Sequence, residues 1–264
     1  MMRAAVLQLP AIGMSTTKLY HYVRIAHKHG VRLILLGEYL LNSFFKELPD
    51  TPLSMIREQS EHHIKILREL AQNYTITFVA PMIIVRKKRP YKCIVKIAPS
   101  SVAYYDQQLL INYPHWNEEK FFANEVAPLV SPMVFTIDGM KFAVMGGFEL
   151  HFDPLWMEVM RKNVDCVLLP TLSTFESRQR WRDLIRCRAF THHCYILRAN
   201  RVGEYQEAGH GWKFYGDSLL MNPYGELEMS LGETEELMIV DLHHAEVLQS
   251  RREWGFKEAL TKRT

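Results

Sequence analysis

A carboxylate after one apolar run and a pair of glycines after another are the residues of this chain best placed for chemistry. Glu38 follows the apolar run 32–36, which predicts a strand buried on both faces, and Gly146 and Gly147 follow the run 141–145. Ligands bind at the carboxyl ends of strands in open α/β sheets, so Glu38 is a candidate site residue; the alternative is a loop carboxylate in water. A strand entering a tight turn is also where α/β enzymes present a nucleophile. No Ser, Thr or Cys stands at the tip of this turn, so the nucleophile is missing.

Length and charge narrow the class of protein. The chain has 264 residues, 48% of them hydrophobic, which suffices for one domain, 1–264, with a sizeable core. Its net charge is +3, and the basic residues are spread out apart from 86–89 and 262–263, so we expect no nucleic-acid partner. Pro10 breaks the N-terminus early and no apolar run reaches membrane-spanning length, so we expect neither a signal peptide nor a membrane partner.

Cysteine and histidine usage indicates a reduced protein without a metal. The four cysteines show no C-x-x-C spacing, which favours a cytoplasmic location. The adjacent histidine pairs at 62–63, 192–193 and 243–244 lack partners at zinc-like spacing. We therefore expect no metal site and no cofactor.

Strands and helices alternate along the chain, with a hairpin in each half, which predicts two mostly parallel sheets with helices outside. The long connection 108–132, which holds Trp116, Glu118 and Glu119, predicts an active-site loop. The expected strands are 3–9, 32–36, 77–85, 92–97, 102–107, 134–137, 141–145, 165–169, 195–199, 216–222, 227–229 and 235–240, and the expected helices are 15–29, 53–72, 154–162, 175–192 and a short charged one from 245.

Nine short motifs stand in an order typical of one known family. They are AAVLQLP (4–10), LILLGEY (33–39), YDQQLL (105–110), NEEKFF (117–122), KFAVMGGFELHFDPLW (141–156), VDCVLLPTL (164–172), CYILRANRV (194–202), YGDSLLMNPYGE (215–226) and REWGF (252–256). By these motifs the chain resembles the carbon–nitrogen hydrolase (nitrilase) superfamily over nearly all its length. The NEEKFF and REWGF pieces are most similar to the branch that hydrolyses N-carbamoyl polyamines and related amides.

The resemblance implies a four-layer α-β-β-α sandwich, with two mixed sheets and outer helices, and a Glu–Lys–Cys triad. In that family a thiolate attacks the carbon, a carboxylate moves the proton and an ammonium holds the oxyanion. Glu38 matches the general-base position, and Glu119 matches a second glutamate that orients the site; the sequence leaves open which of Glu118 and Glu119 faces the pocket. Gln107 stands at the lysine position and Gly147 at the cysteine position, while Gly37 replaces the proline usually found before the base.

The two missing groups depend on each other chemically. Without a thiolate no covalent intermediate forms, so a cation poised for its oxyanion has no charge to stabilise. Gln107 still donates a neutral hydrogen bond, which suits ligand binding better than acyl transfer. No other residue of the chain is expected to replace the two groups. No cysteine lies within reach of the glycine turn by sequence, and no substitute lysine stands at a strand end facing the predicted pocket; the residues compared are Cys93, Cys166, Cys187, Cys194, Lys96, Lys120 and Lys141.

Three functions remain open at this point. The first is a family homologue without thiol hydrolysis that binds a small polar molecule, amide- or amine-like, or serves as an assembly partner. The second is a hydrolase of an amide or N-carbamoyl bond by direct water attack, with Glu38 or Glu119 as general base. The third is a structural homologue with a collapsed pocket. An open cleft favours the first two and a filled one the third; the candidate ligand-binding residues are Trp116, Phe148, Glu149 and Phe175.

The resemblance also implies a homodimer or a higher even oligomer. In the family the helix after the glycine turn, the long helix that follows and the C-terminal tail, here 245–264, pack across a two-fold axis. Trp156, Trp181 and Trp254 fall in those three segments and predict aromatic anchors; the alternative is that they serve only the monomer core.

Glu38 has lost the lysine that balances its charge in working enzymes. An unpaired buried carboxylate costs several kcal/mol, so the protein must neutralise it or surround it with donors. We therefore expect Glu38 to be buried, hydrogen-bonded to Gln107 or to the glycine turn, and to have a raised pKa.

Overall fold

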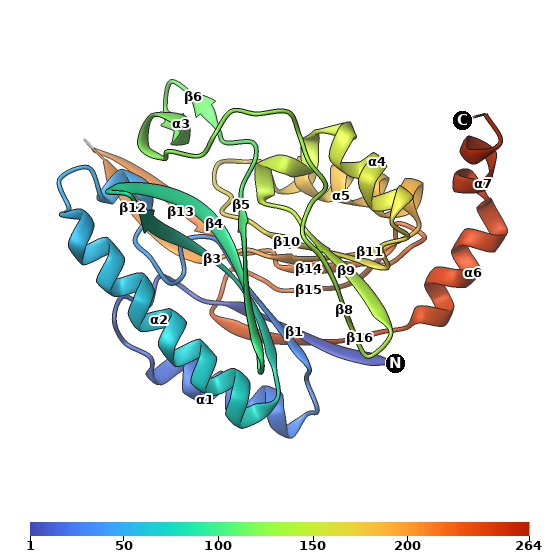
Figure 1. Ribbon diagram of the computed structural model, residues 1–264, viewed down its shortest axis with the longest axis horizontal. Helices are drawn as coiled ribbons and strands as arrows, with labels where there is room; N and C mark the ends of the chain where they lie inside the picture. The colour runs from blue at the N-terminus through green and yellow to red at the C-terminus, as the bar shows by residue number, and fades with distance from the viewer. Residues whose placement is uncertain (208, 264) are drawn as a thin grey trace.

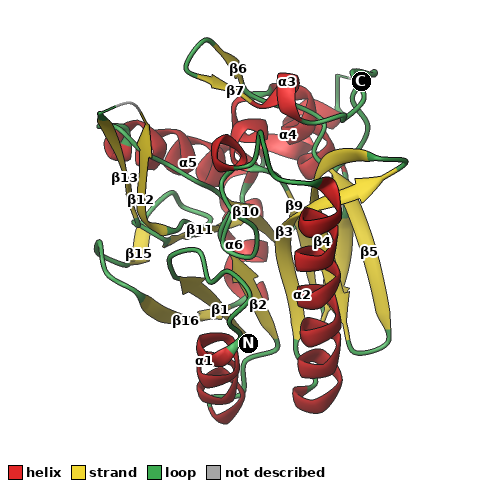
Figure 2. Ribbon diagram, turned by 90° about the vertical axis from the view of Figure 1, so that its left-hand side faces the viewer, coloured by secondary structure: helices red, strands yellow, loops and turns green. Residues whose placement is uncertain are grey.

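Two six-stranded sheets stack face to face in the computed structural model, which describes residues 1–207 and 209–263 (Figures 1 and 2). The first sheet has the strand order β16-β1-β2-β3-β4-β5 and the second the order β15-β14-β11-β10-β9-β8. In each sheet three neighbouring strands run parallel, β1 to β3 and β9 to β11, and antiparallel strands flank them. The strands of the first sheet are β1 (Met2–Gln8), β2 (Leu33–Leu36), β3 (Thr77–Arg86), β4 (Arg89–Ala98), β5 (Ser101–Asp106) and β16 (Glu236–Leu242). Those of the second are β8 (Val134–Ile137), β9 (Met140–Val144), β10 (Cys166–Pro170), β11 (Tyr195–Ala199), β14 (Leu219–Met221) and β15 (Leu227–Ser230).

Helices cover the outer face of each sheet. In Figure 1, α1 (Thr17–Lys28) and α2 (Leu53–Tyr74) lie outside the first sheet, and α4 (Asp153–Arg161) and α5 (Arg178–His192) outside the second. The C-terminal helices α6 (His244–Trp254) and α7 (Phe256–Thr261) stand apart from these layers at one side (Figure 1). The predicted α-β-β-α sandwich with two mixed sheets is therefore confirmed. The expectation that the sheets are mostly parallel is wrong, because hairpins and edge strands make most of the pairings antiparallel.

The strand β2 explains why its sequence is apolar at every position. Leu33 and Leu35 point into the core between the two sheets, whereas Ile34 and Leu36 point into the core beneath α1 and α2. All four side chains are fully buried. Each contributes about 1.5–3 kcal/mol by leaving water, and together they fix the position of the residues that follow the strand.

Two parts of the fold differ from the expectations. Strands β12 (Val202–Glu207) and β13 (His210–Tyr215) form a separate hairpin that the sequence pattern did not predict, because their polar and glycine residues hide the alternation. Helix α5 begins at Arg178 rather than at Phe175, whose φ of +59° breaks the helix.

The segment 108–132 contains β6 (Asn112–Tyr113), β7 (Trp116–Asn117) and α3 (Glu118–Phe121). Among the described residues, no helix is long and apolar enough to cross a membrane.

Candidate functional site

The carboxyl ends of β2, β9 and β10 meet between the two sheets. Glu38 lies two residues beyond β2, and its backbone N–H donates to the carbonyl of Thr171, just beyond β10, at 3.2 Å. Gly37 makes this approach possible, since a Cβ there would stand 3.1 Å from the carbonyl carbon of Asn200. The glycine turn follows β9 at the same edge. The structure thus brings Glu38 and Gly147 together, as the sequence predicted.

Lys92 on β4 is the main partner of Glu38. Its Nζ lies 3.2 Å from Glu38 Oε1 and 2.7 Å from Glu118 Oε1, and its side chain is 6% exposed. Lys92 was not among the lysines named from the sequence, where Glu38 was expected to bind Gln107 or the glycine turn. The Gln107 alternative is wrong, whereas the Gly147 N–H does hydrogen-bond to Glu38. The register of the β4–β5 hairpin could have identified Lys92. Ala98 pairs with Ser101 next to the short turn, and continuing the antiparallel pairing away from that turn places Lys92 opposite Gln107.

Glu118, the first residue of α3, is the glutamate that faces Lys92. It is fully buried and accepts hydrogen bonds from Tyr39 Oη at 2.9 Å and from Lys92 Nζ. The structure places Glu119, the residue given this position from the sequence, at the surface, where it accepts from Asn112 Nδ2 at 2.7 Å. Adjacent residues of a helix point in different directions, so only one of the two can face the cluster.

The cluster of Glu38, Lys92 and Glu118 holds two acids and one base. Burial raises the pKa of Glu38 and outweighs the opposing effects of Lys92 and the Gly147 N–H. Burial acts to lower the pKa of Lys92, but Glu118 and Glu38 together leave it raised. Burial therefore favours the protonated form of Glu38, while Lys92 stays an ammonium. The expected burial and pKa direction of Glu38 are both confirmed.

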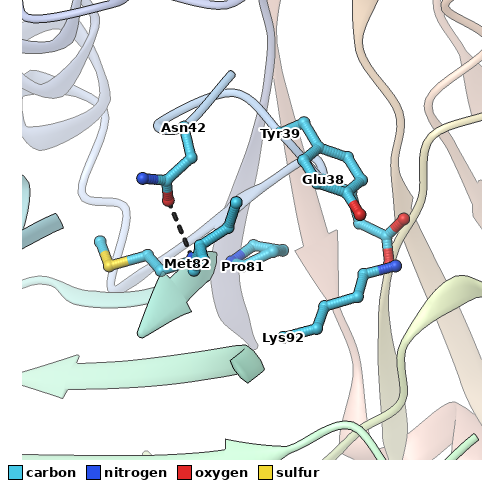
Figure 3. Close-up of a pocket in the computed structure, with 7 residues that line it drawn as sticks. Glu38, Tyr39, Asn42, Pro81, Met82 and Lys92 are labelled. Carbon is cyan, nitrogen blue, oxygen red and sulfur yellow. Dashed lines mark hydrogen bonds and ion pairs between the residues drawn. The ribbon is translucent and has the colours of Figure 1, made fainter. Parts of the chain in front are cut away.

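The cavity beside this cluster is small. Figure 3 shows Lys92 reaching the Glu38 carboxyl, with Tyr39 and Asn42 nearby. The cavity has a volume of about 10 Å³, room for roughly one water molecule. Asn42 is held in place by the Ile83 N–H, which donates to its Oδ1 at 2.9 Å. An amide substrate does not fit in this space.

Gln107 is buried against the glycine turn. Its Nε2 donates to the Leu109 carbonyl at 3.0 Å, and a Cβ at position 146 would stand 2.5 Å from Gln107 Cδ. The carboxamide thus occupies space that only Gly146 leaves free.

Thr171 closes the space beside Gly147. A Cβ at position 147 would lie 3.0 Å from Thr171 Cγ2 and 3.4 Å from the Pro170 carbonyl oxygen. The first contact is tighter than an ordinary van der Waals contact, so a side chain at position 147 requires Thr171 to shift by a few tenths of an ångström.

Glu149 ties the glycine turn to the end of β5. Its Oε1 accepts from Tyr105 Oη at 2.9 Å and from the Gln108 N–H at 2.7 Å, and its Oε2 accepts from the Gly146 N–H at 2.7 Å. Burial raises the pKa of Glu149 to about 7, against the effect of these donors. Its polar contacts are all structural, and it does not line the small cavity.

An aromatic cluster built around Phe44 lies next to the ion cluster and contains Tyr39, Trp116 and Trp212. Trp116 stacks on Trp212 with ring centroids 5.5 Å apart. Of the other predicted ligand-binding residues, Phe148 packs on Phe152 and Phe175 is 56% exposed. None of Trp116, Phe148 or Phe175 lines the cavity at Glu38.

No cysteine takes the place of the missing thiol. Cys93, on β4, donates to Asp106 Oδ1 at 2.9 Å, and burial raises its pKa above the usual range. Burial also raises the pKa of Cys194 to about 12 and that of Cys166 well above its ordinary value. Cys187 is exposed on α5.

The sequence of residues 3–252 matches the carbon-nitrogen hydrolase family. The chain belongs to this family. Its relatives include the deaminated glutathione amidase of Synechocystis, 23% identical with 95% of this chain and 94% of the relative covered, and the N-carbamoylputrescine amidase of Solanum tuberosum, 23% identical with 88% and 82% covered.

Solved structures of the family share the fold. A carbon-nitrogen hydrolase from Helicobacter pylori superposes with a TM-score of 0.84 at 20% identity, covering 97% of this chain and 94% of that one. A variant of the amidase from Nesterenkonia sp. AN1 superposes with a TM-score of 0.78 at 20% identity, covering 98% and 99%. In that variant acrylamide has added to the active-site cysteine.

Replacing Lys92 with Met tests the ion cluster. The change leaves two buried carboxyls without a cation, so we expect the free energy of unfolding to fall by about 3–5 kcal/mol. Lys65→Met, at an exposed position of α2, is the control and should change it by less than about 0.5 kcal/mol. Equal effects of the two changes in urea unfolding would show that Lys92 is not a structural ion.

Replacing Glu38 with Gln tests its raised pKa. The folded protein holds the Glu38 proton more tightly than the unfolded chain does, so the stability from this group is complete below the ordinary pKa of 4.5. It is lost as pH rises from there through the raised pKa. We expect the stability of the E38Q variant relative to the wild type to increase over that interval and then level off. Urea unfolding across pH measures it, and a difference that does not vary with pH would contradict the prediction.

Proposed function

We propose that this protein is a carbon-nitrogen hydrolase family member without thiol-dependent hydrolysis, which works as a subunit of a protein assembly. The observation that carries the proposal is the absence of a side chain at Gly147, where Thr171 Cγ2 would lie 3.0 Å from an added Cβ. The cavity beside Glu38, about 10 Å³ and lined by neither Gly147 nor Gln107, offers no space for an amide there.

The chemistry supports the same proposal. A glycine supplies no atom that can attack an amide carbon, so no acyl intermediate forms. Lys92 contacts Glu118 and Glu38, so its ammonium balances two buried acids, and with no acyl intermediate there is no oxyanion for it to hold. The amidase activities named for the relatives belong to proteins of about one-fifth to one-quarter identity.

A second candidate is hydrolysis of an amide or N-carbamoyl bond by water attack. One observation favours it: Glu38 keeps an ammonium partner in Lys92, so a carboxyl with a raised pKa and a cation still lie side by side. Glu119 is not a suitable base in this scheme, since it lies at the surface on Asn112. The cavity would have to open before any substrate reached Glu38.

We expect hydrolysis of butyramide and N-carbamoylputrescine to stay near background. Loss of a nucleophile that works as one unit with its base costs on the order of a millionfold in turnover. The Gly147→Cys variant should remain inactive as well, because the cavity has no room for substrate; Gly147→Ala is its control for folding. Product release measures turnover, and mass spectrometry of the intact protein detects any acyl adduct.

The possible outcomes separate the two candidates. Turnover by the wild type that disappears in the E38Q variant would establish the water mechanism and reject the proposal. Turnover by the Gly147→Cys variant with an acyl adduct on the new cysteine would show that the pocket opens.

The C-terminal helices support the assembly role. No residue of α7 is buried, and a helix of six residues is marginal on its own. Trp254, Leu248 and Leu260 are 50%, 39% and 38% exposed on α6 and α7. By contrast Trp156 is fully buried and donates to the Leu150 carbonyl, so this tryptophan serves the monomer core instead of an interface.

The assembly role predicts a homodimer or a multiple of it. Light scattering should give at least twice the chain mass of 31.0 kDa. Because Trp254 and Leu260 present apolar surface, the double change Trp254→Glu with Leu260→Glu should shift the protein toward the monomer. Glu61→Gln, on the exposed face of α2, is the control and should leave the mass unchanged. A monomeric wild type in dilute solution would count against the proposal.

A further inference from the structure

A groove at the opposite end of the second sheet has a charge that the proposed assembly role does not explain. It lies between the C-terminal helices and the β8–β9 hairpin and has a volume of about 520 Å³. Lys141 and Asp165 line it near the amino ends of β9 and β10, whereas Gly147 and Thr171 lie beyond their carboxyl ends. The groove is therefore separate from the site at Glu38.

Basic side chains from two parts of the fold face this groove. Lys141 comes from β9, and His244, Arg251 and Arg252 come from α6; Asp165 and Glu258 are the acids that line it. Cations outnumber acids here even when the histidine is neutral.

Asp165, the buried acid of the groove, already has hydrogen-bond and ion-pair partners within the protein. Asp165 Oδ2 accepts from the Lys141 N–H at 2.9 Å, and its Oδ1 lies 3.1 Å from Arg251 Nη1. Arg251 Nη2 also donates to the Val164 carbonyl at 2.6 Å. These contacts hold Arg251 in place and neutralise only one of the groove's cations.

Two cations keep donors for a ligand. The Lys141 ammonium has three N–H groups, and one of them donates to the Lys162 carbonyl at 3.0 Å. Arg252 is exposed beside it on the last turn of α6. Neither side chain forms a salt bridge within the part of the chain that the structure describes.

The pKa of Lys257, on α7, reflects an excess of positive charge near the groove. Its Nζ donates to Asn163 Oδ1 at 2.6 Å, and Asn163 itself lines the groove. Burial lowers the pKa of Lys257, and repulsion from Arg251 and Lys141 lowers it further, more than Glu258 raises it. The acidic residues near the groove therefore do not neutralise all of its positive charge.

We propose that this groove binds a small molecule carrying several oxyanion groups, phosphate or carboxylate. Guanidinium and ammonium donors form charge-assisted hydrogen bonds with such groups, and the volume lies in the range of small-molecule sites. Thr136 and Asn163 add neutral hydrogen-bonding groups at the walls. Leu248, one of the exposed apolar residues of the proposed assembly, also lines the groove, so the proposal requires that a partner subunit leaves the groove open to water. Salt then weakens the binding.

Titration calorimetry with two probes tests the proposal. Pyrophosphate supplies phosphate groups and citrate supplies carboxylates, and sodium chloride at equal ionic strength is the blank. The double variant Lys141→Gln/Arg252→Gln should bind about a hundredfold more weakly, on the basis of roughly tenfold for each charged hydrogen-bond donor lost. Arg24→Gln, an exposed arginine of α1, is the matched control and should bind like the wild type. Unfolding temperatures without ligand check that each variant is folded.

Each outcome decides the proposal. Binding of either probe that falls in the double variant but not in R24Q supports it, and the tighter probe tells phosphate from carboxylate. Heat no greater than with sodium chloride, or equal affinity in the double variant and R24Q, overturns it. These results are independent of hydrolysis, which depends on residues at the other end of the strands.

Discussion

One buried ammonium joins three separate elements of the first half of the chain. Lys92 reaches from β4 to Glu38 after β2 and to Glu118 at the start of α3, three elements that are distant in sequence. Taking these charges out of water is costly, so the arrangement persists only because each partner is placed within contact of another. Tyr39 completes it by donating to Glu118 while its own carbonyl accepts from Arg201. The same contacts fix the position of the segment after β5, because Glu118 belongs to it.

The loss of catalytic groups and the gain of packing are two sides of one change. Where the resemblance implies a cysteine and a lysine, this chain has Gly147 and Gln107, and a cation stands instead on the neighbouring strand, opposite Gln107. A lysine in that position lies beside both buried acids, and their charge is balanced as a result. The aromatic cluster around Phe44 then fills the neighbouring space with apolar side chains.

The fold could be predicted from sequence because its central strands carry continuous apolar runs and its helices a clear period, as in β2 and α2. Burial of Glu38 followed from its place after such a strand. Its partner could not be found in the same way, since Lys92 belongs to no motif and its relation to Gln107 depends on the register of a hairpin. The choice between Glu118 and Glu119 needed the direction of a four-residue helix, and the polar β12–β13 hairpin gave no periodic signal.

The packing around the glycine turn also determines what a side chain introduced there would meet. A side chain returning at position 147 meets Thr171, and one at position 146 meets the Gln107 carboxamide. A cysteine introduced alone at position 147 requires Thr171 to shift, while a smaller residue introduced alone at position 171 leaves a cavity. The effects of substitutions at positions 147 and 171 on stability are therefore expected to be non-additive, because the two side chains compete for the same space.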